Sequence, residues 1–365
     1  MLASQHSSES KTPEAGLSAR PISPKETRAR NRQIKLKSAV ERIYSSAPFK
    51  PVWRLYYALA DWWFRRYWRV QGVSRENPTR PAFLKVEVSN ICNANCTFCA
   101  YQHQTRPKKV MSSAVFNKAI DDFDQLGGGA LVLTPVVGES LVDKDFVEKV
   151  RYARSRKNIT DIDLNSNGIL LTREKFEELA QAGLTRVSLS ISGLEREEYK
   201  RVYRVDKFDK IYRQLLDISE SKYFKAIPFI LNLRTDSLLP QRQPAYKELK
   251  RRGFLIDRAY AFSSWLGAIK SEDLTGWMFL KPGRPPKRTP CAFMWGAMGI
   301  FADGTMSACT CQNFDAHDDL CVGNIMEQNL ADPWKHGKYD EIAQKFRDGD
   351  PPTPCKSCLH YRPAY

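Results

Sequence analysis

The sequence predicts an α/β protein with a parallel sheet, followed by a small α/β unit rich in cysteine. From residue 83 onward, short apolar segments alternate with longer segments of helical period, which is the pattern of βα units around a parallel sheet. From residue 291 the composition shifts to Cys, Gly and Asp. The chain of 365 residues is long for one domain, and its apolar fraction of 42% is enough for a sizeable core.

Several expected elements have a local signal. Thr172 with a glutamate behind it opens a helix as an N-cap, and Asn167-Gly168 ends a strand as a turn. Residues 298–304 are expected to form a strand ending in Asp303-Gly304, a hairpin signal. In chain order, the other expected strands are 83–88, 130–134, 162–165, 186–191 and 227–233. The expected helices are 113–125, 145–156, 172–182, 195–204, 208–219 and 244–252.

Composition divides the chain into five parts. We expect a disordered basic tail, an aromatic and basic amphipathic helix with a linker, a main domain, a second linker and a cysteine-rich domain. These parts are 1–46, 47–80, 81–260, 261–290 and 291–365. Residues 47–70 interleave aromatic and arginine side chains. This pattern suits a helix that lies on an anionic membrane surface or docks a partner, or one that packs on the main domain as a cap.

The net charge of +16 is concentrated at the N-terminus. Residues 1–80 hold 16 Lys and Arg against 6 Asp and Glu, and no nucleic-acid-binding motif occurs, so we expect a solvated tail and no specific nucleic-acid partner. No secretory signal or apolar run of membrane-spanning length is present. A cytoplasmic protein, at most peripheral to the inner membrane surface, is expected. In that reducing setting, clustered cysteines favour metal binding over disulfides.

The first cysteine cluster lies just after the first expected strand. Residues 91–100 are Ile-Cys-Asn-Ala-Asn-Cys-Thr-Phe-Cys-Ala, which places Cys92, Cys96 and Cys99 in the spacing C-x3-C-x2-C. Three thiolates on a [4Fe–4S] cluster leave one iron open for catalysis. A zinc site with His103 as the fourth ligand is the alternative.

With this triad the sequence resembles the radical S-adenosylmethionine (SAM) superfamily. The resemblance implies a partial (β/α)6 barrel of TIM-like type, with a [4Fe–4S] cluster on Cys92, Cys96 and Cys99. It implies that SAM binds the open iron and is cleaved to a 5′-deoxyadenosyl radical, which removes a hydrogen atom from a C–H bond. Phe98 matches the family's aromatic position beside the adenine. A reductant such as flavodoxin or ferredoxin is an implied partner.

Further family positions match in order behind the triad. Gly138-Glu139-Ser140 resembles the motif that accepts the SAM amino group, with Ser140 in place of the usual Pro. Residues 165–168 and 188–193 resemble the ends of the third and fourth strands. The resemblance therefore implies that SAM is bound by Gly138, Glu139, Asn167, Ser190 and Ser192.

The second cysteine group provides four thiols with Cys355 and Cys358 in C-x2-C spacing. Four thiolates suffice for a closed [4Fe–4S] cluster, and a structural zinc site is the alternative. Together with Gly304, the group resembles the auxiliary-cluster domain called SPASM in its shorter "twitch" form. The resemblance implies one auxiliary cluster, held by Cys291, Cys309, Cys355 and Cys358.

Cys311 and Cys321 remain. One of them could donate a hydrogen atom to a substrate radical, with Cys311 favoured because it adjoins Cys309. The alternatives are that both are incidental small apolar residues, or that one replaces Cys309 as a ligand.

Three reactions are open for such an enzyme: dehydrogenation, epimerisation and the modification of a ribosomally made peptide. Twitch-type relatives favour a sugar, a cyclitol or a glycan as the substrate over a peptide. A different class also stays open, namely an iron–sulfur protein that does not cleave SAM and only transfers electrons or binds a partner.

Overall fold

The computed structural model describes residues 59, 62, 80–281 and 287–364. The expectations for residues 1–46 and for almost all of 47–70 lie outside the described residues. Of the aromatic and basic stretch, Leu59 and Trp62 are helical, with exposed fractions of 59% and 58%.

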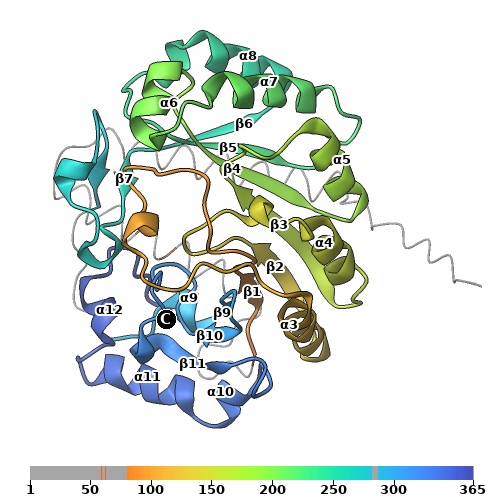
Figure 1. Ribbon diagram of the computed structural model, residues 1–365. Helices are drawn as coiled ribbons and strands as arrows, with labels where there is room; N and C mark the ends of the chain where they lie inside the picture. Colours follow the sequence, from red (N-terminus) through yellow and green to blue (C-terminus); the bar gives the residue numbers. More distant parts are fainter. Residues whose placement is uncertain (1–58, 60–61, 63–79, 282–286, 365) are drawn as a thin grey trace, which may run out of the picture.

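Six parallel strands in chain order form most of one nine-stranded sheet, whose order is β11-β10-β9-β1-β2-β3-β4-β5-β6. Helices α3 to α8 connect these six strands and cover one face (Figure 1). This is the expected α/β fold, a partial (β/α)6 barrel. The strands β1 to β6 span Phe83–Val86, Gly129–Leu133, Ile159–Ser166, Arg186–Ser192, Phe229–Arg234 and Leu255–Ala259. The helices α3 to α8 span Ser113–Gln125, Phe146–Arg154, Arg173–Gln181, Arg196–Tyr203, Phe208–Ser219 and Pro244–Arg252.

Local capping signals place several helix ends where the sequence predicts them. The Ser112 side chain accepts a hydrogen bond from the backbone N–H of Val115 at the start of α3, and Thr172 accepts one from Lys175 at the start of α5. Gly253 ends α8 in the left-handed conformation at φ +106°. Helices α3, α7 and α8 begin and end at the predicted residues, whereas strand β6 was not predicted.

The cysteine-rich part continues the main sheet. Strand β9 (Ala297–Ile300) pairs in parallel with β1, and β10 (Thr305–Ser307) and β11 (Cys321–Asn324) extend the sheet as an antiparallel hairpin. The predicted turn at Gly304 joins β9 to β10, with φ +90°. Helices α9 to α12 pack around this extension (Figure 1). Helices α9 to α12 span Ala292–Trp295, Asp332–Lys335, Lys338–Arg347 and Thr353–Ser357.

Residues 261–281, which fall within the expected second linker, have a defined structure. Strands β7 (Ala261–Phe262) and β8 (Phe279–Leu280) pair in parallel as a small separate sheet. Between them lie two short 3₁₀ helices, η4 (Trp265–Gly267) and η5 (Ser271–Asp273). This segment follows β6 directly and so stands at the edge of the barrel.

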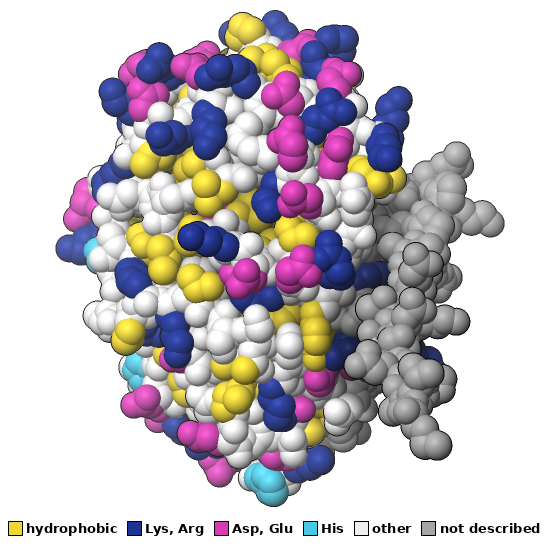
Figure 2. Space-filling view, turned by 45° about the vertical axis from the view of Figure 1, so that its right-hand side comes forward, with side chains coloured by type: hydrophobic (Ala, Val, Ile, Leu, Met, Phe, Trp, Pro, Cys, Tyr) yellow, Lys and Arg dark blue, Asp and Glu magenta, His cyan; other side chains and the backbone are white. Residues whose placement is uncertain are grey.

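One hydrophobic core serves the barrel and the C-terminal part, since the same buried cluster includes Leu84 of β1, Met298 of β9 and Phe346 of α11. On the face in Figure 2, basic and acidic side chains are intermixed. Among the described residues, no helix is both long and apolar enough to cross a membrane.

Candidate active site

The three thiols of the first group lie together in the loop between β1 and the 3₁₀ helix η1 (Ala100–His103). Burial raises the pKa of Cys92 to about 11 and that of Cys99 to about 12. Burial also raises the pKa of Cys96, and the charges of both other thiols add to this rise. Because the charge of Cys92 acts on both Cys96 and Cys99, and that of Cys99 acts on Cys96, the structure brings the three predicted ligands into one neighbourhood.

Among the described residues, no three His, Cys, Asp or Glu side chains form a group that could hold a single metal ion. Thiols that bind different irons of a cubic cluster surround it and do not converge on one point. His103, the alternative zinc ligand, is exposed.

Gly138 lets the loop after β2 approach the end of β1. Its φ is +142°, and a Cβ there would lie 2.5 Å from the carbonyl oxygen of Ser89 and 2.9 Å from the Cα of Asn90. The next backbone N–H, that of Glu139, donates to the carbonyl of Ile91 at 2.8 Å. Glycine is therefore required for the close contact between this loop and the triad loop.

The Glu139 carboxylate is held by three hydrogen bonds. It accepts one from the backbone N–H of Leu141 at 3.0 Å, one from the Ser166 hydroxyl at 2.7 Å and one from the backbone N–H of Asn167 at 2.7 Å. Only 2% of the residue is exposed, and this burial raises its pKa, which the hydrogen bonds oppose. The carboxylate thus joins the ends of β2 and β3.

Asn167 joins the end of β3 to the triad loop. Its side-chain amide donates to the side-chain oxygen of Asn93 at 2.6 Å and lies 3.8 Å from the sulfur of Cys92. Its own side-chain oxygen accepts from the backbone N–H of Ile169 at 3.0 Å. Both donor and acceptor are therefore used to fix the amide against the first thiol.

Arg234, at the end of β5, is a site residue that the sequence analysis missed. Its Nε donates to the Ser190 hydroxyl oxygen at 3.2 Å, and the Tyr203 hydroxyl donates to the same oxygen at 3.3 Å. The positive charge of Arg234 acts to lower the pKa of Cys96 and Cys99, against the larger effect of burial. A signal existed, because the carboxyl ends of barrel strands usually carry the functional residues.

The remaining two predicted SAM contacts differ in their surroundings. Ser192 is fully buried, and its hydroxyl donates to the backbone carbonyl of Glu198 in α6, so the structure does not bring it to the triad. Phe98 lies beside the barrel opening, where its ring stacks on that of Phe262 with centroids 5.0 Å apart and meets the edge of Tyr203 at 5.8 Å.

Five thiols gather in the second group, one more than the four predicted ligands. A hydrogen bond from the Cys311 thiol, supported by backbone N–H groups, lowers the pKa of Cys309 to about 6. Burial raises the pKa of Cys358 to about 12, and the charges of Cys309 and Cys291 add to it. The same two charges act on Cys355, whose pKa is also raised by burial.

The two remaining cysteines, Cys311 and Cys321, have different surroundings. The pKa of Cys311 is raised by its hydrogen bond to Cys309, by burial and by the charges of the neighbouring thiols. Cys321, at the start of β11, donates instead to the carbonyl of Ala316 at 3.3 Å. Burial raises the pKa of Cys321 to about 11, and no other thiol contributes.

Lys85 lies between β1 and the second thiol group. Its neighbours Leu84 and Val86 are buried in the core, so the lysine points to the opposite, inner face of the sheet. Its Nζ donates to the carbonyl of Thr310 at 2.7 Å. Burial lowers its pKa, while the charges of Cys311 and Cys309 act to raise it.

Other polar side chains line the inner face of the parallel strands. Arg186 of β4 pairs with Asp163 of β3, and the side-chain amide of Asn232 in β5 donates to the Ser188 hydroxyl at 2.5 Å. A sheet face inside a small barrel would bury such groups at a cost unless they were paired. Here they form a hydrogen-bonding wall on the same face of the sheet as Lys85.

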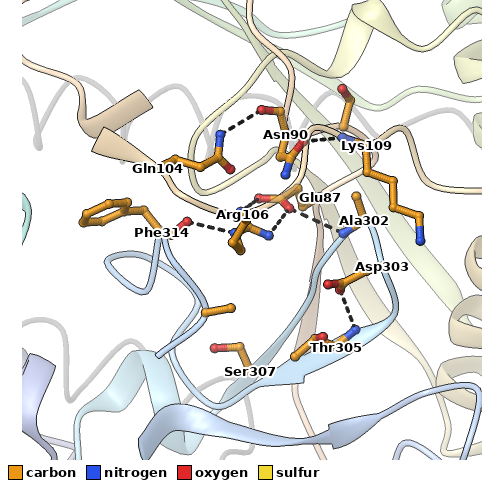
Figure 3. Close-up of polar contacts among 12 residues, drawn as sticks. Glu87, Asn90, Gln104, Arg106, Lys109, Ala302, Asp303, Thr305, Ser307 and Phe314 are labelled. Carbon is orange, nitrogen blue, oxygen red and sulfur yellow. Dashed lines mark hydrogen bonds and ion pairs between the residues drawn. The ribbon is translucent and has the colours of Figure 1, made fainter. Parts of the chain in front are cut away.

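A buried ion pair fixes the segment after the triad loop to the C-terminal part (Figure 3). Arg106 donates to both oxygens of Glu87 at 2.8 and 2.9 Å, and its Nε donates to the carbonyl of Phe314 at 3.0 Å. The guanidinium also lies over the Phe301 ring, 4.3 Å from its centroid. Glu87 further accepts from the backbone N–H of Ala302 at 3.4 Å. These contacts tie β1 to the turn that follows β9.

Two family models match the chain. Residues 86–237 match the radical SAM superfamily, and residues 291–359 match the SPASM model, described as an iron–sulfur cluster-binding domain. The two matches include all three thiols of the first group and all five of the second.

Curated relatives carry two kinds of name. The molybdenum cofactor biosynthesis protein moc-5 of Caenorhabditis elegans is 30% identical over 316 residues, which are 75% of this chain and 52% of that protein. The GTP 3′,8-cyclase of Desulforamulus reducens is 29% identical over 136 residues, 36% of this chain and 41% of that protein. The chain thus spans about half the length of these relatives. The cyclase of Clostridium perfringens is 25% identical over 283 residues, 73% of this chain and 84% of that protein.

Solved structures share the fold. BtrN in complex with AdoMet and 2-DOIA has a TM-score of 0.53 at 17% identity, covering 78% of this chain and 95% of BtrN. The enzyme anSMEcpe with bound AdoMet has a TM-score of 0.50 at 18% identity, covering 73% and 84%. At such identities the likeness concerns the fold alone.

Proposed function

The chain belongs to the radical SAM superfamily and carries a C-terminal iron–sulfur cluster-binding domain, and from this premise we propose that it removes a hydrogen atom from a substrate C–H bond. The family's cofactors are [4Fe–4S] clusters and SAM. The observation that carries the proposal is the meeting of the triad loop, the Glu139 carboxylate and Arg234 at the carboxyl ends of the barrel strands.

The residues present fit a cluster with one open iron. Cys92, Cys96 and Cys99 supply three neighbouring thiols, and Gly138 leaves no side chain between their loop and Glu139. When bound there together, a reduced cluster and SAM supply a one-electron cleavage that yields a 5′-deoxyadenosyl radical.

Glu139 and Arg234 suit the two charged groups of an amino acid. An ionised carboxylate offers about four acceptor sites, and three hydrogen bonds to Glu139 leave capacity for an ammonium group. Arg234 donates its Nε–H to Ser190. The terminal N–H groups of its planar guanidinium suit the two oxygens of a carboxylate. We assign the amino group of SAM to Glu139 and its carboxylate to Arg234, with Asn167 and Phe98 fixing the loop around them.

We assign the auxiliary cluster to Cys291, Cys309, Cys355 and Cys358. Cys311 is the fifth thiol of that group, and this supports a role for it as a hydrogen-atom donor close to the cluster. Cys321 has no such neighbour.

The substrate in this proposal is a small polyhydroxylated molecule or glycan that is oxidised or epimerised. The wall formed by Lys85, Asp163, Arg186, Ser188 and Asn232 supports it, because hydroxyl groups need many fixed donors and acceptors. A flavodoxin or ferredoxin would deliver the electron.

Anaerobic reconstitution tests the proposal. With dithionite and SAM, the wild-type protein should form 5′-deoxyadenosine. Cys321→Ala should form it as well, whereas Cys96→Ala should form none. Absence of the product from the wild-type protein would favour an electron-transfer or binding protein. With a substrate in hand, Cys311→Ala should spare a dehydrogenase and stop an epimerase, and deuterium uptake from heavy water should accompany epimerisation alone.

GTP is a second candidate substrate, since several relatives are named GTP 3′,8-cyclases. Lys85 places an ammonium group on the inner face, and a cation there would suit one phosphate of a triphosphate. GTP therefore belongs in the substrate panel. Its conversion would replace the sugar proposal without affecting the SAM chemistry.

We also propose that residues 47–70 contact an anionic membrane surface or a partner, because Leu59 and Trp62 are exposed on a helix. Sedimentation with anionic liposomes tests this, and equal binding by a chain that lacks residues 1–75 would contradict it.

A further inference from the structure

The segment of residues 263–268, called here the strap, has an unusual backbone. Trp265 and Leu266 have φ values of +48° and +61°, and Gly267 follows at +97°. Two consecutive non-glycine residues in the left-handed region are disfavoured by contacts of their Cβ atoms. Such a conformation persists only where surrounding contacts hold it.

One end of the strap contacts the first thiol group. The indole N–H of Trp265 donates to the carbonyl of Phe98 at 2.8 Å, and this carbonyl belongs to the peptide that leads into Cys99. The indole also meets the edge of Phe314, with ring centroids 6.2 Å apart. Trp265, Cys99 and Phe314 belong to one small apolar cluster, separate from the main core.

The other end contacts the second thiol group. The Ser263 hydroxyl donates to the side-chain oxygen of Gln312 at 2.5 Å, and the hydroxyl oxygen accepts from the backbone N–H of Trp265 at 3.2 Å. Gln312 in turn donates its backbone N–H to the sulfur of Cys309 at 3.4 Å and its side-chain amide to the carbonyl of Cys311 at 2.8 Å.

The strap is therefore the central part of a continuous chain of contacts from Cys99 to Cys309. It runs through the Phe98 carbonyl, the Trp265 indole and backbone, the Ser263 hydroxyl and the Gln312 amide. Ser263 and Gln312 are buried, with exposed fractions of 4% and 3%, so solvent does not compete for these hydrogen bonds.

We infer that the strap couples the two cluster sites, so that occupancy of the first site changes the environment of the second. Trp265, Ser263 and Gln312 are positioning residues in this inference. Binding of SAM at the triad shifts the Phe98 carbonyl, and this shift moves the Trp265 indole. The strained backbone passes that movement to the N–H that faces Cys309. Hydrogen bonds to a ligating sulfur are one of the factors that set a cluster's reduction potential. The inference rests on the cluster assignments proposed above.

The test uses the reconstituted protein with both clusters. The reduction potential of the second cluster is measured by a redox titration followed by electron paramagnetic resonance, with and without saturating SAM. We expect SAM to change the reduced-to-oxidised ratio of that cluster at fixed potential about fivefold to tenfold, and tenfold is ~59 mV for one electron.

Trp265→Phe keeps an aromatic ring and removes the indole N–H, so the SAM effect should fall below about twofold. Ser263→Ala should do the same, and the double variant should lose no more than either single one because both lie on one path. Trp334→Phe is the matched control: that indole stacks on Tyr339, and among the described residues its N–H has no hydrogen-bond partner. Trp334→Phe should keep the wild-type effect.

An unchanged SAM effect in Trp265→Phe would overturn the inference. So would a wild-type protein in which SAM does not change the reduction potential of the second cluster. Failure of the proposed function is a different result, seen when SAM leaves the spectrum of the first cluster unaltered. In that case Cys96→Ala, which removes the first cluster, replaces SAM as the perturbation. Amide hydrogen exchange of residues 309–313 should then respond to Cys96→Ala in the otherwise wild-type chain and not in a chain that also carries Trp265→Phe. Equal responses in both backgrounds would overturn the inference.

Discussion

Glu139 is the residue on which the first site depends most directly, because its carboxylate joins two strand ends and accepts three hydrogen bonds. Glu139→Gln places an amide NH₂ against donors that a carboxylate satisfies. We expect SAM affinity to fall and the protein to lose about 1–3 kcal/mol of stability, the cost of unsatisfied buried donors.

Anaerobic calorimetry of SAM binding and urea unfolding measure the two effects. Glu341→Gln, an exposed change on α11, is the control and should alter neither. Wild-type SAM affinity in Glu139→Gln would show that this carboxylate is structural only.

The second thiol group makes a prediction about metal content. In the proposed assignment Cys355→Ala removes one ligand from a closed cluster, so we expect a loss of about four iron and four sulfide per chain. Cys321→Ala should keep the full content, because Cys321 lies apart from the other five thiols. Iron and sulfide analysis of the reconstituted variants measures both contents. Iron loss from Cys321→Ala would contradict the ligand assignment.

At this scale the sequence predicts residues that belong to local patterns. The triad, Glu139 and Asn167 stand in short motifs, and the structure brings them together. Arg234 and Trp265 could not be found in this way. Both act on the triad loop, which is distant in the chain: Arg234 through its charge and Trp265 through a hydrogen bond, and only the folded barrel brings them close.

Among the elements, the end of β1 is fixed to the C-terminal part by Glu87 and Arg106, which pair with each other and bond to Ala302 and Phe314. The side chains of Glu87 and Arg106 are 2% and 8% exposed. Arg106→Met leaves Glu87 buried without its charge partner, and we expect a loss of about 3–5 kcal/mol. Urea unfolding monitored by circular dichroism measures it.

Arg151→Met is the matched control, since its partner Glu148 is exposed on a helix surface and the pair contributes little. Adding Glu87→Met to Arg106→Met should recover part of the lost stability, because no buried charge then remains unpaired. No recovery would mean that Glu87 acts mainly through its other contact, the N–H of Ala302.

Element boundaries show why some predictions succeed and others fail. Helices α3, α7 and α8 match because amphipathic period and local end signals define them. Strand β6 was missed because its sequence, Leu-Ile-Asp-Arg-Ala, places charged residues in the strand interior. An inner barrel face that binds polar groups erases the apolar alternation by which strands are recognised.

For the molecule as a whole, the sheet makes the two predicted domains interdependent. Ending the chain at residue 290 removes β9, leaves β1 as an unpaired edge and strips the core of Met298 and Ile300. We therefore expect this truncated chain to aggregate or to lack a cooperative thermal transition, because an exposed apolar edge strand promotes association. Solubility and near-ultraviolet circular dichroism measure this, and a folded, monomeric 1–290 fragment would contradict it.

The parallel pairing of β1 with β9 has a consequence for biosynthesis. During translation β1 leaves the ribosome early, but its neighbour β9 follows only after more than half of the chain has been made. Until then one edge of β1 stays unpaired. During that interval the nascent polypeptide exposes the unpaired edge of β1, and an exposed apolar strand edge promotes association with other chains. Insertion of iron and sulfur at the second site would then follow, not precede, the emergence of Cys358 from the ribosome.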